Sequence, residues 1–162
     1  MSEAVDRRLF LVRHASAEPV GEASSDRQRM LRPKGAQESV ELGFEMADRG
    51  YVPQLVLGSS ATRTWQTWQH MIGAFPRAVD ARFTDFLYSA SDEDILGLLR
   101  RLPESVERVM VVGHNPALER LADRLSGERT TLNPGDMIAL QLETEWAEIA
   151  DRSTQVLGVI RH

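Results

Sequence analysis

Two apolar segments that each end in a histidine constrain the fold of this chain more than any other feature. Residues 9–12 lead directly into Arg13 and His14, and residues 109–113 lead into His114. Apolar runs of this length are typical of buried strands, where arginine and histidine are rare. The carboxyl ends of parallel strands lie along one edge of an open α/β sheet, so we expect the two imidazoles to share one pocket. The alternative is that each histidine only caps its own strand, but the polar neighbours of both favour the shared pocket.

The rest of the chain alternates predicted strands and helices. Residues 15–33 form a polar loop that is too long for a simple connection, and such loops are often functional. Strands are predicted over residues 9–12, 55–57, 108–113, 137–142 and 156–160, and helices over 35–49, 61–74 and 117–125, with a further helix capped by Ser91. Apolar residues at helical spacing predict the buried faces of the first two helices, namely Val40, Phe44, Ala47, Trp65, Trp68 and Ile72.

This order of elements predicts an α/β fold. Alternating strands and helices form a mostly parallel sheet with helices on both faces, and the last two strands are expected to pair antiparallel at an edge. No repeat, low-complexity tract or linker interrupts the sequence, and 162 residues are enough for one core. We therefore expect a single domain over residues 1–162.

The composition argues against several partners and chemistries. The net charge of -5 gives no sign of a nucleic-acid partner. Residues 1–8 are polar and charged, and no apolar run is long enough to span a membrane, so we expect a cytoplasmic protein without a membrane partner. Cysteine is absent, which removes disulfides and thiolate nucleophiles. Almost all cations are arginines, whose planar guanidinium suits phosphate.

Polar groups that follow the second predicted strand complete the expected pocket. Ser59, Ser60 and Arg63 would bring a second guanidinium to the edge of the sheet where the two histidines lie. Arginines and helix N-termini both favour the oxygens of a tetrahedral dianion, so we expect a phosphate site. Ser16 and Asn115 are candidates for its floor, unless they only close turns.

The chemistry expected of this pocket is phosphoryl transfer through histidine. The sequence has neither a glycine-rich Walker loop nor a dense carboxylate cluster for two magnesium ions. An imidazole is the remaining nucleophile, because a neutral ring nitrogen can attack phosphorus and carry the phosphoryl group. Arginines and a second histidine would stabilise the phosphoryl oxygens. Loss of an alkoxide leaving group also needs a proton, so an aspartate or glutamate is expected nearby.

The same residues resemble the histidine phosphatase superfamily. Residues 11–15 are similar to its signature, whose usual form is Arg-His-Gly. The residues that resemble its other motifs follow in the same order: Asp26, Arg29, Leu31 and Gly35, then Ser59, Ser60, Arg63 and Thr67, and finally Val112, Gly113, His114, Asn115 and Pro116. The short length and the motif spacing are most similar to the SixA-like branch, the phosphohistidine phosphatases.

The resemblance implies a fold, a mechanism and a substrate class. The fold is a three-layer α/β/α sandwich with a mostly parallel central sheet, phosphoglycerate mutase-like. His14 is the phosphorylated nucleophile, and Arg13, Arg63 and His114 form the phosphate pocket, with no metal and no cofactor. The implied partner is a phosphorylated protein carrying phosphohistidine, with a small phosphorylated substrate as the alternative, and inorganic phosphate is the product. We expect a monomer.

Two departures from the family pattern concern catalysis. Ala15 stands where many relatives have glycine. The larger members supply a glutamate as proton donor from an inserted segment, which this chain is too short to contain. Asp85 is nearest to it by order along the chain, although it is equally well interpreted as an exposed loop acid. A phosphoramidate substrate needs less acid assistance, because its leaving group is better.

Two other functional interpretations stay open. One is a metal-dependent hydrolase with His14, His114 and an acid such as Asp26 as ligands, which the adjacent arginines disfavour by repelling a cation. The other is a non-catalytic module that binds phosphate or a phosphoprotein. A basic stretch would steer an acidic phosphoprotein to the pocket or form only a solvated surface; it consists of Arg27, Arg29, Arg32 and Lys34.

Overall fold

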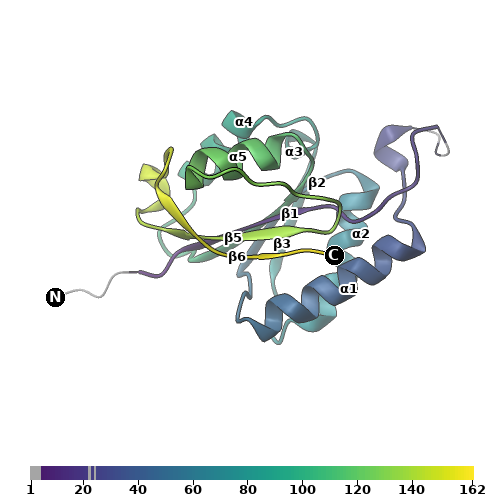
Figure 1. The fold of residues 1–162 in the computed structure, drawn as a ribbon, viewed down its shortest axis with the longest axis horizontal. Coiled ribbons are helices and arrows are strands. Elements are labelled where there is room, and N and C mark those ends of the chain that lie inside the picture. The colour runs from purple at the N-terminus through teal and green to yellow at the C-terminus, as the bar shows by residue number, and fades with distance from the viewer. Residues whose placement is uncertain (1–4, 22, 24) are drawn as a thin grey trace.

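A six-stranded sheet with helices on both faces organises the chain, as the computed structural model shows (Figure 1). The structure describes residues 5–21, 23 and 25–162; residues 1–4 of the predicted polar N-terminal segment lie outside them. The strands are β1 (Arg8–Arg13), β2 (Leu55–Ser59), β3 (Asp80–Thr84), β4 (Arg108–Gly113), β5 (Met137–Leu142) and β6 (Thr154–Ile160). The helices are α1 (Pro33–Asp48), α2 (Thr62–Met71), α3 (Asp85–Tyr88), α4 (Asp92–Arg100) and α5 (Ala117–Ser126), with short 3-10 turns η1 (Asp26–Gln28), η2 (Ile72–Ala74) and η3 (Trp146–Glu148).

The sheet runs in the order β3-β2-β4-β1-β5-β6. Its first four strands are parallel, β5 pairs antiparallel with β1, and β6 pairs antiparallel with β5. The predicted three-layer α/β/α sandwich with antiparallel closing strands is therefore confirmed. Because β2, β4 and β1 are neighbours and parallel, their carboxyl ends lie side by side.

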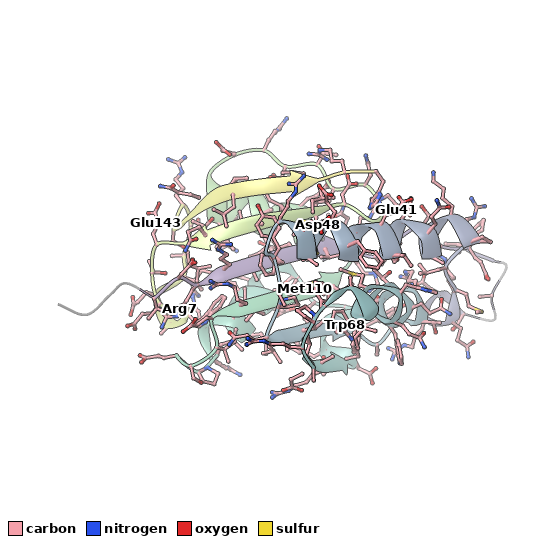
Figure 2. All side chains as sticks on the ribbon, turned by 90° about the horizontal axis from the view of Figure 1, so that it is seen from below. Arg7, Glu41, Asp48, Trp68, Met110 and Glu143 are labelled. Atoms are coloured by element: carbon pink, nitrogen blue, oxygen red, sulfur yellow. The ribbon has the colours of Figure 1, made fainter. Side chains whose placement is uncertain are left out.

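The central strands are buried on both faces, and successive residues belong to two different cores. In β1, Leu9 and Leu11 pack beneath α4 and α5, whereas Phe10 and Val12 pack against α1 and α2. Figure 1 shows α3, α4 and α5 on one side of the sheet and α1 and α2 on the other. Figure 2 shows the side of the sheet that α1 and α2 cover. Met110 is one of the residues that pack between these helices and the sheet.

The buried faces of α1 and α2 differ from the predicted ones. Val40 and Phe44 are exposed, and α1 instead buries Leu42 and Met46. The buried face of α1 also holds residues that give no apolar signal, namely Gly35, Glu38, Ser39 and Gly43. A Cβ atom on Gly43 would lie 2.9 Å from the carbonyl oxygen of Met71, so α1 and α2 approach each other closely there. Ala47, the third predicted residue, is half-buried and packs against the core.

The prediction for α2 is correct at one of its two tryptophans. Trp68 is buried as expected, but Trp65 and Ile72 are exposed. Trp65 stacks on the ring of Phe83, with the ring centroids 6.2 Å apart. Its place is therefore over the edge of the sheet rather than in the core.

Strand β3 and helix α3 were not predicted. In β3 exposed residues alternate with half-buried ones, because this strand forms the edge of the sheet. Its two inward-facing residues, Ala81 and Phe83, give too short an apolar signal to identify a strand. Throughout the described residues, every helix is too short or too polar to cross a membrane.

Candidate active site at the carboxyl end of the sheet

The polar residues that follow β1 and β4 meet at one open cavity of about 400 Å³. The ring centroids of His14 and His114 lie 5.3 Å apart, so the structure brings the two strand-end histidines together. Arg63 reaches the same cavity from α2. The full lining is Arg13, His14, Asp26, Arg29, Arg63, Tyr88, His114 and Asn115.

The His14 side chain is held in one tautomer. Its Nδ1 atom lies 2.8 Å from the carbonyl oxygen of Ala15. A carbonyl oxygen can only accept, so Nδ1 carries the proton and Nε2 keeps its lone pair. Burial lowers the pKa of His14 to about 3, and the nearby His114, Arg63 and Arg13 act in the same direction. The imidazole is therefore neutral at neutral pH and has a free nucleophilic nitrogen.

The backbone that orients His14 is fixed from α2. The Ala15 amide donates to Oγ1 of Thr67 at 3.0 Å, and that hydroxyl donates to the Arg63 carbonyl oxygen at 2.8 Å. Thr67 therefore connects the segment after β1 to the helix that carries the catalytic candidate Arg63.

The same backbone is also fixed from α1. The buried Glu38 accepts hydrogen bonds from the Ser16 amide at 2.9 Å and from the Ser16 hydroxyl at 3.1 Å. A Cβ atom on Gly35 would lie 2.1 Å from the Ser16 carbonyl oxygen, so only glycine permits this approach. Ser16, expected at the pocket floor, instead directs its hydroxyl to Glu38 and does not line the cavity.

His114 and Arg63 form the opposite side of the cavity. Nε2 of His114 lies 2.8 Å from Oγ of Ser59, and Nδ1 lies 3.4 Å from an Nη2 of Arg63. Guanidinium nitrogens only donate, so Nδ1 accepts and the Nε2 proton is donated to Ser59. Burial, followed by the charge of Arg63, lowers the pKa of His114 to about 4. This second imidazole is also neutral at neutral pH.

Arg13 and Asn115 are held by the same backbone carbonyl group. Both donate to the carbonyl oxygen of Leu132, at 2.9 Å from Nη1 of Arg13 and 2.8 Å from Nδ2 of Asn115. Asn115 lies in the cavity lining, where the sequence places it. Among the described residues, the buried Nε atoms of Arg13 and Arg63 and Oδ1 of Asn115 have no hydrogen-bond partner.

The remaining lining residues come from two segments outside the sheet. Asp26, on η1, accepts hydrogen bonds from Nη1 of Arg29 at 2.9 Å, from Nη2 of Arg63 at 3.1 Å and from the Tyr88 hydroxyl. These three donors, the Tyr88 hydroxyl first, hold the pKa of Asp26 well below its usual range. The Tyr88 ring meets His114 edge-on, with the centroids 5.8 Å apart.

Sequence reasoning gave no role to Tyr88 and named Asp26 only as a possible metal ligand. The sequence signal that places Asp26 and Arg29 near the pocket is their resemblance to a family segment, and Arg29 also belongs to the predicted basic stretch. No sequence signal points to Tyr88, because its contact with Asp26 joins residues 62 positions apart.

Asp85, the expected proton donor, is the first residue of α3 and does not line the cavity. Its exposed carboxylate accepts hydrogen bonds from the Ser60 hydroxyl at 2.6 Å and from Arg27. These contacts lower the pKa of Asp85, so the carboxylate is ionised at neutral pH. Arg27 also lies over the Tyr88 ring, 4.4 Å from its centroid.

The proposed metal-ligand set does not suit a cation. Nδ1 of His14 and both ring nitrogens of His114 are engaged with other groups, and Asp26 binds two guanidiniums. Over the part of the chain that is described, no cluster of three or more histidine and acidic side chains is arranged to hold a metal ion. Three guanidiniums and one carboxylate line the cavity, and this balance of charge favours an anion over a cation.

Two known proteins are similar to this chain over most of its length. No protein-family model matches the chain. It is 35% identical over 159 residues to the uncharacterized protein Rv1276c of Mycobacterium tuberculosis, an alignment that covers 91% of this chain and 97% of that protein. It is 29% identical over 158 residues to the uncharacterized chloroplastic protein At3g52155 of Arabidopsis thaliana, covering 91% and 72% respectively.

The solved structures identify the class. A candidate phosphohistidine phosphatase SixA from Agrobacterium tumefaciens superposes with a TM-score of 0.84 at 28% identity, covering 98% of this chain and all (100%) of that one. The protein histidine phosphatase SixA complexed with tungstate has a TM-score of 0.80 at 22% identity, covering 94% and 96%. A phosphoglycerate mutase from Plasmodium falciparum, at 14% identity and a TM-score of 0.63 over 98% and 91%, shares the fold alone.

A parallel sheet with an arginine and a histidine at one strand end and a second histidine at another defines the class of histidine phosphatases. The chain belongs to the histidine phosphatase superfamily, in its SixA-like branch.

Proposed function

We propose that the protein is a phosphatase that forms a phosphohistidine intermediate on His14 and acts on phosphohistidine in a phosphorylated protein. The observation that carries this proposal is the state of His14. Its Nδ1 atom donates to the Ala15 carbonyl oxygen, and its low pKa keeps the imidazole neutral. This is the state that a nitrogen nucleophile requires. The cavity around His14 is lined by arginines. The likeness to SixA structures supports the substrate class.

In the first step, Nε2 of His14 attacks phosphorus, and the bond between phosphorus and the substrate nitrogen breaks. The substrate imidazole leaves as a neutral molecule when its other nitrogen is protonated. Arg13 and Arg63 bind the phosphoryl oxygens, whose charge is shared during transfer, and His114 joins them when its Nε2–H turns from Ser59 to a phosphoryl oxygen. In the second step water attacks the phosphorylated His14 and inorganic phosphate is released. None of these steps requires a metal.

The cavity lining supports a role for Asn115 in this mechanism but gives no support to Ser16 or Asp85. Asn115 lies beside Arg13 and completes the phosphate site. Ser16 and Asp85 lie outside the lining, so this mechanism gives them no contact with phosphate. The leaving-group proton then comes from solvent, which suits an imidazole better than an alkoxide.

The test is to trap the intermediate. Wild-type protein and a His14→Ala variant are mixed with phosphoramidate that carries a phosphorus label and quenched in alkali, in which phosphohistidine survives. We expect label on His14 in the wild type and none in the variant, which also loses turnover. Turnover by His14→Ala, or a wild type that never carries label on His14, would contradict the mechanism.

A further inference from the structure

Asp26 is the one acidic side chain in the cavity lining, counted over the described residues. Its carboxylate accepts from Arg63 and Arg29, two guanidiniums that line the same cavity. A phosphoryl group needs donors of this kind, and it cannot use those already bound to a carboxylate. In the free protein, Asp26 therefore occupies donors that the substrate must gain.

We propose that an incoming phosphoryl group takes over the contacts of Asp26 with Arg63 and Arg29, and that the released Asp26 carboxylate then accepts the proton of the water that hydrolyses phosphorylated His14. This inference rests on the proposed function and adds a residue to its second step. Asp26 would touch the attacking water and is therefore proposed as a catalytic residue.

The hydrolytic step balances with these groups alone. A bond forms between the water oxygen and phosphorus, and the bond between phosphorus and Nε2 of His14 breaks. The electron pair returns to Nε2, which restores the neutral imidazole with its proton on Nδ1. One proton of the water passes to the Asp26 carboxylate and then to solvent. Inorganic phosphate leaves, and Asp26 binds the two guanidiniums again.

Tyr88 is the positioning residue for this exchange. Its hydroxyl donates to Oδ2 of Asp26, a contact that does not involve the phosphate-binding guanidiniums. The ring is held between His114, which it meets edge-on, and the guanidinium of Arg27. Tyr88 therefore keeps the carboxylate at the cavity after the arginines have turned to the phosphoryl group.

The exchange also changes the basicity of Asp26 in the required direction. In the free protein, the hydrogen bonds from Tyr88, Arg29 and Arg63 keep its pKa low, so the carboxylate is a weak base. Loss of the two guanidinium contacts and the arrival of a dianion both raise that pKa. No other lining residue is as suitable, since His14 carries the phosphoryl group and Nδ1 of His114 faces Arg63.

The experiment separates formation of the phosphoenzyme from its decay. Wild type, Asp26→Asn, Tyr88→Phe and a matched control, Asp80→Asn, are reacted with labelled phosphoramidate in a rapid-quench instrument. Asp80 also pairs with an arginine, Arg82, but lies at the start of β3, at the opposite end of the strands from the cavity.

We expect Asp26→Asn to form the phosphoenzyme and to hydrolyse it about 100-fold more slowly, the usual cost of losing a general base, so that label accumulates on His14. Asp26→Glu should restore part of the decay rate. Tyr88→Phe should slow decay by about tenfold, and Asp80→Asn should match the wild type.

Wild-type decay in Asp26→Asn would overturn the inference and leave the proposed function intact, whereas a wild type without label on His14 would overturn the proposed function itself.

A binding measurement distinguishes catalysis from a structural role. Tungstate, an analogue of phosphate, should bind Asp26→Asn about tenfold more tightly than the wild type, because a competing negative charge has been removed. Weaker tungstate binding by Asp26→Asn would mean that the carboxylate only holds Arg63 in place, and would overturn the inference.

Discussion

Nδ1 of His14 lies 2.8 Å from the carbonyl oxygen of Ala15, so the reactive nitrogen of the site is selected by the residue that follows it. The position of that carbonyl depends on Thr67 and Glu38, which hold the adjacent amides. Nucleophilicity at Nε2 is therefore a property of the backbone as well as of the imidazole.

Replacement of Arg63 by alanine should lower kcat/KM by about 10²–10³-fold, the usual cost of removing one preorganised donor from a transition state. Arg63 is buried beside His114 and Asp26, so no other side chain can take its position. Steady-state kinetics with phosphoramidate measure the effect, and circular dichroism checks the fold. Arg82→Ala removes an exposed arginine on β3 and should leave kcat/KM unchanged. An unfolded Arg63→Ala variant would show that this arginine is structural.

Two threonines of α2 offer a matched pair. Thr67→Val removes the acceptor for the buried Ala15 amide, which should cost about 1–3 kcal/mol of unfolding free energy and lower kcat. Thr64 is equally buried, but its hydroxyl has no partner among the described residues, so Thr64→Val should be neutral or stabilising. Chemical denaturation and kinetics measure both variants. Equal losses in the two would show that the Thr67 hydrogen bond does not matter.

A second pair of variants tests the close approach at the start of α1. Gly35→Ala places a methyl group 2.1 Å from the Ser16 carbonyl oxygen, and overpacking of this kind costs about 1–3 kcal/mol. The forced shift should also reduce phosphoenzyme formation. Gly97→Ala in α4 meets no atom within 4 Å and should instead stabilise the helix by up to about 1 kcal/mol. Unchanged stability in Gly35→Ala would contradict the packing described for Ser16.

The two neutral histidines predict how stability depends on pH. Burial lowers the pKa of His14 to about 3 and that of His114 to about 4, from 6.5 in the unfolded chain. Below pH 6.5 the unfolded chain binds more protons than the folded one. Above pH 6.5 the titration of these two histidines therefore leaves the free energy of unfolding unchanged. As the pH falls toward 4 and then 3, the free energy of unfolding decreases by up to about 1.4 kcal/mol per pH unit for each histidine. Urea unfolding between pH 7.5 and 5 measures this slope.

His14→Asn, which cannot be protonated in this range, should reduce that slope. A free energy of unfolding that stays constant between pH 7 and 5 in the wild type would show that His14 and His114 are not held neutral. A slope that His14→Asn leaves unchanged would assign the effect to other groups.

The sequence allows the strand-end residues Arg13, His14 and His114 to be predicted because the strands before them are buried on both faces. Uninterrupted apolar runs make β1 and β4 recognisable, and the residues after them are then placed by sheet topology alone. Strand β3 is different, since only Ala81 and Phe83 face inward at the edge of the sheet. The buried face of α1 also gives no clear apolar period, because Gly35, Glu38, Ser39 and Gly43 belong to it while Phe44 is exposed.

The mouth of the cavity could not be predicted from local patterns. Tyr88 contacts Asp26 across 62 positions, and Asp26 binds Arg63 across 37 positions, so these contacts exist only once the sheet has formed. The order of residues along the chain points to Asp85 as a proton donor, and in the structure its carboxylate accepts hydrogen bonds from Ser60 and Arg27 outside the cavity lining. Order along the chain does not fix such contacts where the loops of several strands converge.

The residues that line the cavity thus differ in how firmly the fold holds them. His14 and His114 follow strands that both cores hold in place, whereas Asp26 and Tyr88 belong to the short segments η1 and α3, which meet through the hydrogen bond from Tyr88 to Asp26. We therefore expect the preference for one substrate over another to depend on the mouth of the cavity, whereas the attack on phosphorus depends on the residues at the strand ends.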